Sequence, residues 1–105
     1  MEEVKVTDKI TVLNDAFRRS GQGVVVTRGI QAMEDMMGLM MKVRKYDNFS
    51  EANDAYGEHD FGSLMWEGEK VFWKIDYYDM SLTHWEDPLS DRCKRVMTVM
   101  LADEY

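Results

Sequence analysis

The chain has 105 residues, of which 45% are apolar and 11% are aromatic, and its formal net charge at pH 7 is −7. This length and composition predict a single folded domain over 1–105, and they exclude an intrinsically disordered chain. The negative charge argues against direct binding to nucleic acid, because that binding depends on a basic patch.

The sequence also predicts where the protein resides. Cys93 is the single cysteine, which excludes an internal disulfide. No apolar run is long enough to span a membrane, and the first residues are acidic where a signal peptide is basic. We therefore expect a cytoplasmic protein that has no membrane partner.

A helix is predicted over 7–19. Ile10, Leu13 and Phe17 fall on one helical face, which we expect to be buried. The glycine-containing segment 20–23 ends this helix, because glycine readily adopts the left-handed conformation found at helix ends.

A second helix is predicted over 30–44, after a β-branched segment at 24–27 that predicts a buried strand. Five methionines form a stripe in this helix: Met33, Met36, Met37, Met40 and Met41. Such a stripe is typical of a core-facing surface, and we interpret it in this way. The alternative is an exposed binding groove, because methionine side chains adapt to different partners.

Residues 46–60 follow no regular period and contain many turn-forming residues, so a long loop is predicted. Loops of this length in compact domains tend to be functional or disordered. Four ring-bearing residues, Tyr46, Phe49, Tyr56 and His59, favour an ordered loop that is anchored to the rest of the domain.

Segments 61–67 and 70–79 predict a β-hairpin with a two-residue turn at 68–69, in which Glu67 lies opposite Lys70. Alternation divides the side chains between two faces. The face expected in the core carries Leu64, Trp66, Val71, Trp73, Ile75 and Tyr77. The other face is mixed and partly exposed, and it carries Phe61, Ser63, Met65, Phe72, Lys74, Asp76 and Tyr78.

A third helix is predicted over 88–103, since Pro88 suits a first helical turn. One helical face would carry Leu89, Cys93, Val96, Met97, Met100 and Leu101. The β-branched residues Val96, Thr98 and Val99 make a strand the alternative. The predicted fold class is α+β, in the order α-β-α-β-β-α, with a small, largely antiparallel sheet packed by helices.

The acidic residues are concentrated in one part of the chain. Residues 46–91 contain twelve acidic residues and two basic ones. Carboxylates interleaved with aromatic rings are suited to bind Arg and Lys side chains, although an ordinary solvated acidic face is the alternative. The candidate partner-binding residues are Asp54, Tyr56, Glu58, Asp60, Phe72, Asp76, Tyr78, Asp79, Glu86 and Asp87.

A catalytic interpretation would set His59 against Asp54 or Asp60, because a carboxylate orients the imidazole of a general base. The alternative is a histidine that fixes the long loop, and we assign no catalytic residue. The segment 47–58 has the length of a calcium-binding loop, but Phe49 cannot ligate a metal and Ala52 stands where glycine is required. We therefore predict no metal site and no cofactor.

Several motifs carry a resemblance to a known family. They are LNDAFRR at 13–19, TRG at 27–29, ND at 53–54, YGEHDFG at 56–62, FWKIDYYD at 72–79 and RVMTVMLADEY at 95–105. The chain resembles, nearly end to end, a small uncharacterised bacterial family known as a domain of unknown function, whose members occur often on plasmids and prophages. Ala55 stands where that family commonly has proline. The resemblance implies a setting in a bacterial or phage-infected cell, and it implies no activity.

The charge pattern and the resemblance together lead us to expect an acidic, non-enzymatic inhibitor from a mobile element. It would bind a basic surface of a nucleic-acid-handling complex, as an anti-CRISPR or similar anti-defence protein does. The alternative is a small hydrolase or nuclease-like enzyme that uses His59 with Asp54 or Asp60. A third hypothesis is an oligomeric accessory domain that uses the methionine helix.

Overall fold

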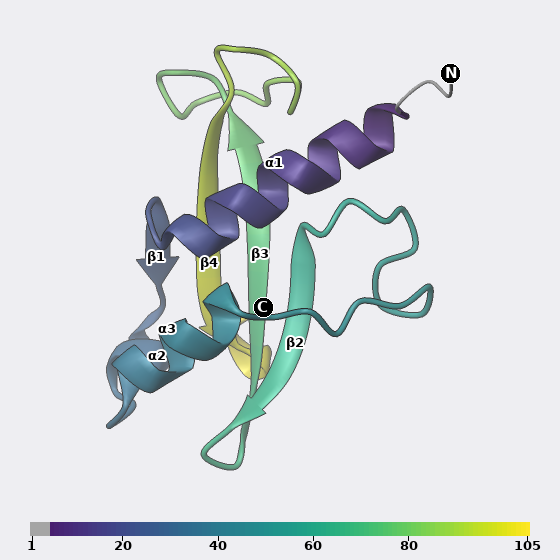
Figure 1. Cartoon of the computed structure of the whole chain (residues 1–105). Coiled ribbons are helices and arrows are strands. Elements are labelled where there is room, and N and C mark those ends of the chain that lie inside the picture. Colours follow the sequence, from purple (N-terminus) through teal and green to yellow (C-terminus); the bar gives the residue numbers. More distant parts are fainter. Residues whose placement is uncertain (1–4) are drawn as a thin grey trace.

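The computed structural model describes residues 5–105, in which helices lie on one side of a four-stranded sheet (Figure 1). The elements in chain order are α1 (Val6–Ser20), β1 (Val24–Val26), α2 (Arg28–Gln31), α3 (Met36–Arg44), β2 (Phe61–Trp66), β3 (Glu69–Tyr78), β4 (Lys94–Leu101) and the short 3₁₀ helix η1 (Ala102–Glu104). The α+β class is confirmed. Within residues 5–105, no helix has the length and apolar character needed to cross a membrane.

The strands lie in the order β1-β4-β3-β2. The longest strand, β3, pairs antiparallel with both β2 and β4, whereas β1 pairs parallel with β4. The sheet is therefore largely antiparallel, as predicted. Because β4 lies between β1 and β3, the C-terminal segment joins the N-terminal part of the chain to the hairpin.

The hydrophobic core lies between the sheet and the helices. Its completely buried apolar side chains are Ile30, Leu39, Val43, Val71, Trp73, Met97 and Val99. Burial of one large apolar side chain contributes about 1.5–3 kcal/mol of transfer free energy. The predicted core face of the hairpin is confirmed, since Val71, Trp73 and Ile75 are buried and the other three residues of that face pack against them.

The turn of the β2–β3 hairpin lies one residue earlier than predicted. Glu67 and Gly68 form it with φ values of 50° and 79°, and a type I′ turn requires positive φ at both positions. Trp66 pairs with Glu69, so the predicted pairing of Glu67 with Lys70 is wrong. A shift of one residue in the turn changes each partner by two positions, and each side chain therefore stays on its predicted face.

Helix α1 buries a different stripe from the predicted one. Ile10 is buried, but the other buried residues of the helix are Asn14 and Arg18. Leu13 is 43% exposed, so its predicted burial is wrong, whereas Phe17 is partly buried against the core. The polar stripe is buried because its side chains find hydrogen-bond partners beneath the helix.

The predicted helix over 30–44 is divided into α2 and α3. Asp35 caps the second helix, with its carboxylate accepting a hydrogen bond from Gly38 N at 2.9 Å. The buried residues of α3 are Leu39 and Val43. They lie four residues apart and face the sheet, and this leaves most of the methionine stripe to one side of the core.

The methionines themselves are only partly in the core. Met33 and Met40 are partly buried and pack against it. Met36, Met37 and Met41 are exposed, and the exposed fraction of Met37 is 80%. The core interpretation is therefore wrong for three of the five methionines.

The predicted C-terminal helix over 88–103 is wrong. The segment 94–101 forms β4, as the strand alternative required, and turns precede it. Met97 and Val99 alternate into the core, while Val96 lies on the opposite face. Pairing with β1 on one side and β3 on the other makes the extended conformation the stable one, although the apolar spacing also fits a helix.

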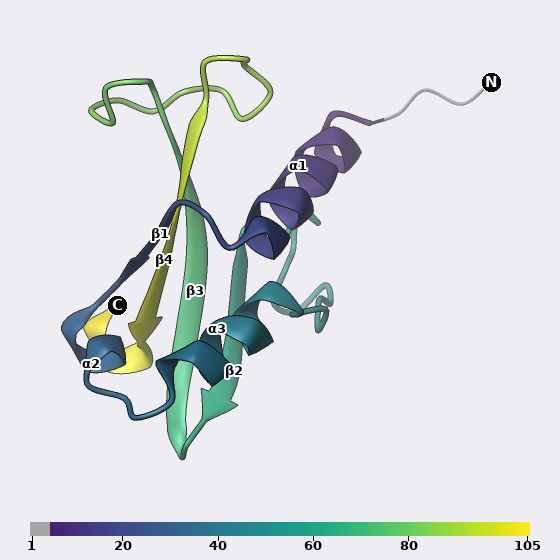
Figure 2. The same cartoon turned by 60° about the vertical axis from the view of Figure 1, so that its left-hand side comes forward.

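The second face of the sheet is largely uncovered, because α1 and α3 both lie on the other side (Figure 2). Phe61, Phe72 and Tyr105 cluster on this face with ring centroids 5.2 to 6.3 Å apart. Met65 on the same face is 60% exposed. The prediction of a mixed, partly exposed face is confirmed.

Gly62 provides a test of the packing around Trp73. A Cβ atom at position 62 would lie 2.6 Å from Trp73 Cε2, which is closer than packed atoms approach. We expect Gly62→Ala to lower the free energy of unfolding by about 1–3 kcal/mol, measured by urea denaturation. Ser63→Ala on the open face is the control, with an expected change below about 0.5 kcal/mol. Equal stabilities of the two variants would contradict this packing.

Candidate functional site

Three consecutive residues of the long loop, 57–59, are tied to helix α1. The pairs are Thr11 Oγ1 with the Gly57 carbonyl, Asn14 Nδ2 with the Glu58 carbonyl at 3.0 Å, and His59 Nδ1 with Asp15 Oδ1 at 2.9 Å. The contacts come from successive turns of the helix. The end of the loop is therefore anchored, and His59 takes part as predicted, but Tyr56 is exposed and its predicted anchoring role is wrong.

Asn14 links the helix to the sheet as well as to the loop. Its Nδ2 also donates to the Tyr77 hydroxyl at 2.8 Å, and its Oδ1 accepts from Arg95 Nε at 2.7 Å. The Arg95 guanidinium lies over the Tyr77 ring, 5.3 Å from the ring centroid. A completely buried polar side chain thus has its hydrogen bonds made, as stable protein interiors require.

Arg18 is completely buried at the other end of this polar stripe. Its Nη1 pairs with Asp15 Oδ1 at 3.0 Å, and its Nη2 donates to the Tyr46 carbonyl at 3.0 Å. The guanidinium also lies over the rings of Phe49 and Trp73, at 5.4 and 5.2 Å from their centroids. The charge is thus compensated by a carboxylate, a carbonyl and two aromatic rings.

His59 lies between two carboxylates. Its Nδ1 contacts Asp15, and its Nε2 lies 3.5 Å from Asp54 Oδ2. The imidazole stacks on Phe49, with centroids 3.6 Å apart and an interplanar angle of 4°. The backbone turns at His59, where φ is 56°. Of the two predicted partners, Asp54 is therefore close to the histidine, whereas Asp60 does not bond to it.

Asp60 bonds instead to Tyr77, whose hydroxyl donates to Asp60 Oδ2 at 3.3 Å. The predicted pairing of His59 with Asp60 is therefore wrong, because the turn at His59 directs the two side chains to different partners. Burial, together with the nearby charges of Asp60 and Glu58, raises the pKa of Tyr77. Its hydroxyl thus keeps the proton that this hydrogen bond uses.

Asp15 is the residue of this cluster that sequence reasoning missed. Burial acts to raise the pKa of Asp15, but the hydrogen bonds and charges of His59 and Arg18 outweigh burial and hold the pKa below its usual value. Asp15 and His59 are 44 positions apart, so no local spacing connects them. The available signal was the group of polar residues inside the helical segment 13–19.

Three carboxylates crowd at the end of the anchored loop. Burial raises the pKa of Glu58, and repulsion from Asp60 and Asp54 adds to this effect. Burial likewise raises the pKa of Asp60, with repulsion from Asp54 and Asp76. Asp76 belongs to the open face of the sheet, and its carboxylate pairs with Lys74 at 3.2 Å. Four of the predicted partner-binding residues therefore lie close enough to repel one another.

The other predicted residues lie in three further places. Tyr56 is 83% exposed on the long loop, and Phe72 and Tyr78 lie on the open face of the sheet. Asp79, Glu86 and Asp87 belong to the segment that connects β3 with β4.

Asp79 organises its own loop, where its carboxylate accepts hydrogen bonds from Thr83 N at 3.1 Å and Ser81 Oγ at 2.8 Å. These bonds lower the pKa of Asp79 to about 2. This carboxylate is therefore less available to a partner than its exposure suggests.

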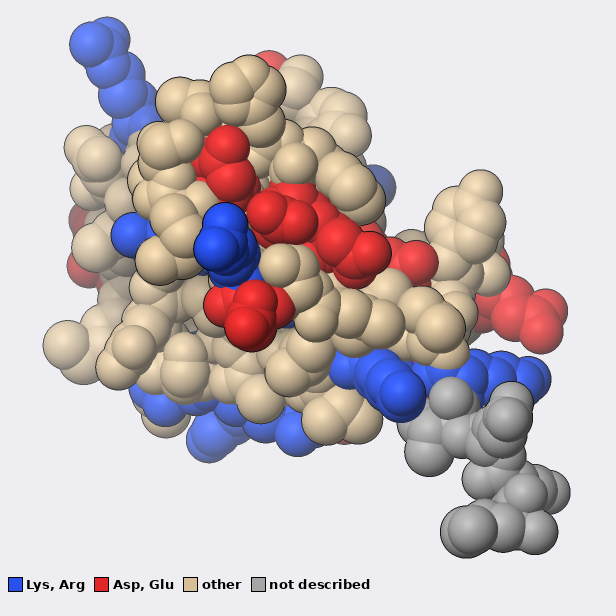
Figure 3. Space-filling model, turned by 90° about the horizontal axis from the view of Figure 1, so that it is seen from above, with Lys and Arg blue, Asp and Glu red and all other residues tan. Residues whose placement is uncertain are grey.

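The face seen in Figure 3 carries both kinds of charge. Acidic side chains form a band across the middle of this view with basic groups beside them, and further basic side chains line the edge on which α1 and α3 lie. The name acidic band is used here for the neighbouring carboxylates of Glu58, Asp60 and Asp76, whereas the nearby Asp54 side chain is only 6% exposed and lies against His59. Within residues 5–105, no group of three or more His, Cys, Asp or Glu side chains is arranged to hold a metal ion.

Two substitutions of carboxylates should change stability in opposite directions at pH 7. Asp15→Ala leaves the buried Arg18 without its carboxylate, and we expect a loss of up to about 3 kcal/mol in the free energy of unfolding. Asp60→Asn should raise this free energy, because the raised pKa of Asp60 shows that its ionised form is disfavoured in the folded chain. Urea denaturation of both variants measures these changes.

The pH dependence of the free energy of unfolding provides the control for these two variants. Because the folded-state pKa of Asp15 is lowered, its stabilisation is present above the unfolded-state pKa and is lost as the pH falls through the folded-state pKa. The penalty at Asp60 is present above its raised folded-state pKa and disappears below the unfolded-state value. An Asp60→Asn variant less stable than wild type at pH 7 would contradict the proposed repulsion.

Comparison with known proteins places the chain in a family. The family described as "Protein of unknown function (DUF3768)" matches residues 26–104, which include every strand except the first two residues of β1 and leave α1 outside the match. No curated protein and no solved structure gives a significant match. The matched segment covers most of the chain, and the protein therefore belongs to this family of proteins of unknown function.

Proposed function

We propose that this protein is a non-enzymatic inhibitor from a mobile element, which binds a basic surface of a nucleic-acid-handling complex. An anti-CRISPR or another anti-defence protein in the cytoplasm of a bacterial or phage-infected cell is its most concrete form. The observation that carries the proposal is the pair of carboxylates Glu58 and Asp60, which lie at the end of a loop that is anchored to α1. No Lys, Arg or His within residues 5–105 forms an ion pair with Glu58 or Asp60.

Anchoring of the loop makes these carboxylates effective for binding. A mobile loop loses conformational freedom when a partner immobilises it, and this loss weakens the complex. Here the bonds from Thr11, Asn14 and Asp15 hold the loop before any partner arrives. The carboxylates can then occupy the positions that phosphates take on the positively charged surface of the partner, and their charge speeds the encounter.

The enzyme alternative would use His59 with Asp54. The two side chains are close, but each ring nitrogen of His59 faces a carboxylate. A general base needs a nitrogen that can reach the substrate proton, and Asp54 lies beside the ring nitrogen that Asp15 does not contact. The stacking of His59 on Phe49 fits a residue that fixes the loop, and this supports the binding function over catalysis.

Affinity capture from a bacterial lysate, with the captured partner identified and then purified, tests the proposal. We expect binding at low salt and release by a salt gradient, because the Debye length shrinks from about 10 Å at 0.1 M to about 3 Å at 1 M. Glu58→Lys should weaken binding to the purified partner at least about tenfold, because like charges facing each other cost several kcal/mol. The measurement is the dissociation constant at two salt concentrations.

Glu69→Lys is the matched control, because Glu69 is an exposed acid at the far end of the hairpin. It changes the net charge by the same amount as Glu58→Lys, and we expect binding close to that of wild type. Duplex DNA should compete with this protein for the partner. The proposal fails if binding is insensitive to salt and to Glu58→Lys, or if one partner holds DNA and this protein at the same time.

A further inference from the structure

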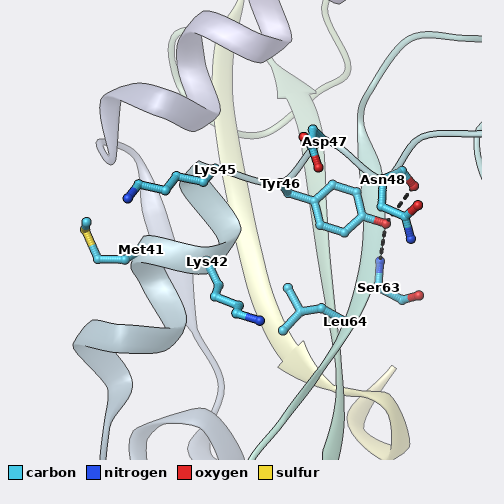
Figure 4. Close-up of a pocket in the computed structure, with 8 residues that line it drawn as sticks. All are labelled: Met41, Lys42, Lys45, Tyr46, Asp47, Asn48, Ser63 and Leu64. Atoms are coloured by element: carbon cyan, nitrogen blue, oxygen red, sulfur yellow. Dashed lines mark hydrogen bonds between the residues drawn. The ribbon is translucent and has the colours of Figure 1, made fainter.

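Two adjoining cavities lie at the C-terminal end of α3. The larger, of about 550 Å³, lies between α3 and β2 (Figure 4). The smaller, of about 170 Å³, is lined by Arg19, Met41, Arg44 and Lys45. Met41 and Lys45 line both cavities, so the two adjoin along these side chains, and a ligand that lies across them would contact both. The name basic groove is used for the two adjoining cavities together, and their main walls are Arg19, Met41, Lys42, Arg44, Lys45 and Leu64.

The groove concentrates positive charge in a protein whose net charge is negative. Its four cationic side chains form no ion pair within residues 5–105. Arg44 Nε donates to the Arg19 carbonyl at 3.0 Å, which holds the Arg44 guanidinium beside Arg19. Asp47 is the single carboxylate among the lining residues of the two cavities. The four cations therefore repel one another with little compensation from the protein itself.

The two parts of the groove differ in chemistry. The smaller part has three cations and one methionine as its walls. In the larger part, Lys42 extends over Leu64, while Lys45 and Met41 extend toward the end of α1 (Figure 4). The ring of Tyr46 adds a further apolar wall, and its hydroxyl is already bonded to Asn48 and Ser63. One end thus suits an anion of high charge, and the other suits an apolar or planar group.

We infer that the basic groove binds a small organic phosphate, with the phosphate in the smaller part and the organic portion in the larger part. Arginine and lysine donors match phosphate oxygens in geometry and charge. The volume of the larger part is within the range of about 300–1,000 Å³ typical of small-molecule sites. This site lies on the basic side of the molecule, and it is separate from the acidic band and from the function proposed above.

The inference is tested by titrating the full chain with three probes and monitoring its amide NMR spectrum. The probes are AMP, inorganic phosphate and adenosine. We expect AMP to shift amide signals of residues 41–48 and of Leu64, and to bind more tightly than inorganic phosphate. Adenosine should give no saturable shift, because it lacks the anion that the cations recognise. Equal binding of AMP and inorganic phosphate, or of AMP and adenosine, overturns the assignment.

Substitutions distinguish a built site from general attraction to a positive surface. Lys45→Ala should weaken AMP binding about tenfold, because a charge-assisted hydrogen bond is lost. Asp47→Asn should strengthen binding, since it removes the one carboxylate that opposes the ligand. Lys9→Ala is the matched control, because Lys9 is an exposed cation of α1 outside the groove, and it should leave the affinity unchanged.

Folding of each variant is checked by its amide spectrum before titration. The inference is wrong if AMP gives no saturable shift at millimolar concentration in the wild-type chain. It is also wrong if Lys45→Ala and Lys9→Ala reduce the affinity equally, because binding would then depend on overall charge.

Discussion

The burial of Arg18 is the constraint on which the arrangement of helix, loop and sheet depends. A guanidinium without solvent contact has to be paired and hydrogen-bonded where it lies, because an uncompensated buried charge costs several kcal/mol. Asp15 and the Tyr46 carbonyl pair with its two terminal nitrogens and the rings of Phe49 and Trp73 lie beside it, whereas Nε has no hydrogen-bond partner within residues 5–105. These partners belong to α1, to the loop and to β3, so the charge is compensated only when all three are in place.

The same constraint determines where the negative charge is found. One oxygen of the Asp15 carboxylate contacts both Arg18 and His59. His59 also stacks on the ring of Phe49, which lies beside the Arg18 guanidinium. The loop is therefore held close to α1 at its beginning and at its end. Glu58 and Asp60 flank His59 and are carried into a crowded position, where burial and mutual repulsion disfavour their ionised forms. The stabilisation that Arg18 and its partners supply thus offsets the repulsion among the carboxylates of the loop.

Local patterns were enough to predict some of this arrangement and not the rest. Alternation correctly predicted which side chains of β3 lie on each face. The misplaced turn did not change this assignment, because it shifted each partner by two positions and the period of a strand is two. The apolar pattern of segment 94–101 fits both a strand and a helix. The segment forms a strand because it pairs with β1 and β3, and this pairing cannot be predicted from the segment alone. The burial of Asn14 and Arg18 could not be predicted, because Tyr77 and the Tyr46 carbonyl, which bind them, are distant in sequence. The site was predictable in its residue types around His59, but its key carboxylate was not.

Net charge also misleads when it is used to describe a single surface. The molecule extends 48 × 32 × 22 Å, whereas the Debye length at physiological ionic strength is about 8 Å. Charges at one end are therefore largely screened from a ligand at another, and each surface acts through its own nearby groups. The basic groove and the acidic band can coexist on one small domain for this reason. A chain with a charge of −7 can thus present a cationic site, and the local arrangement of side chains, rather than the total, determines what each surface binds.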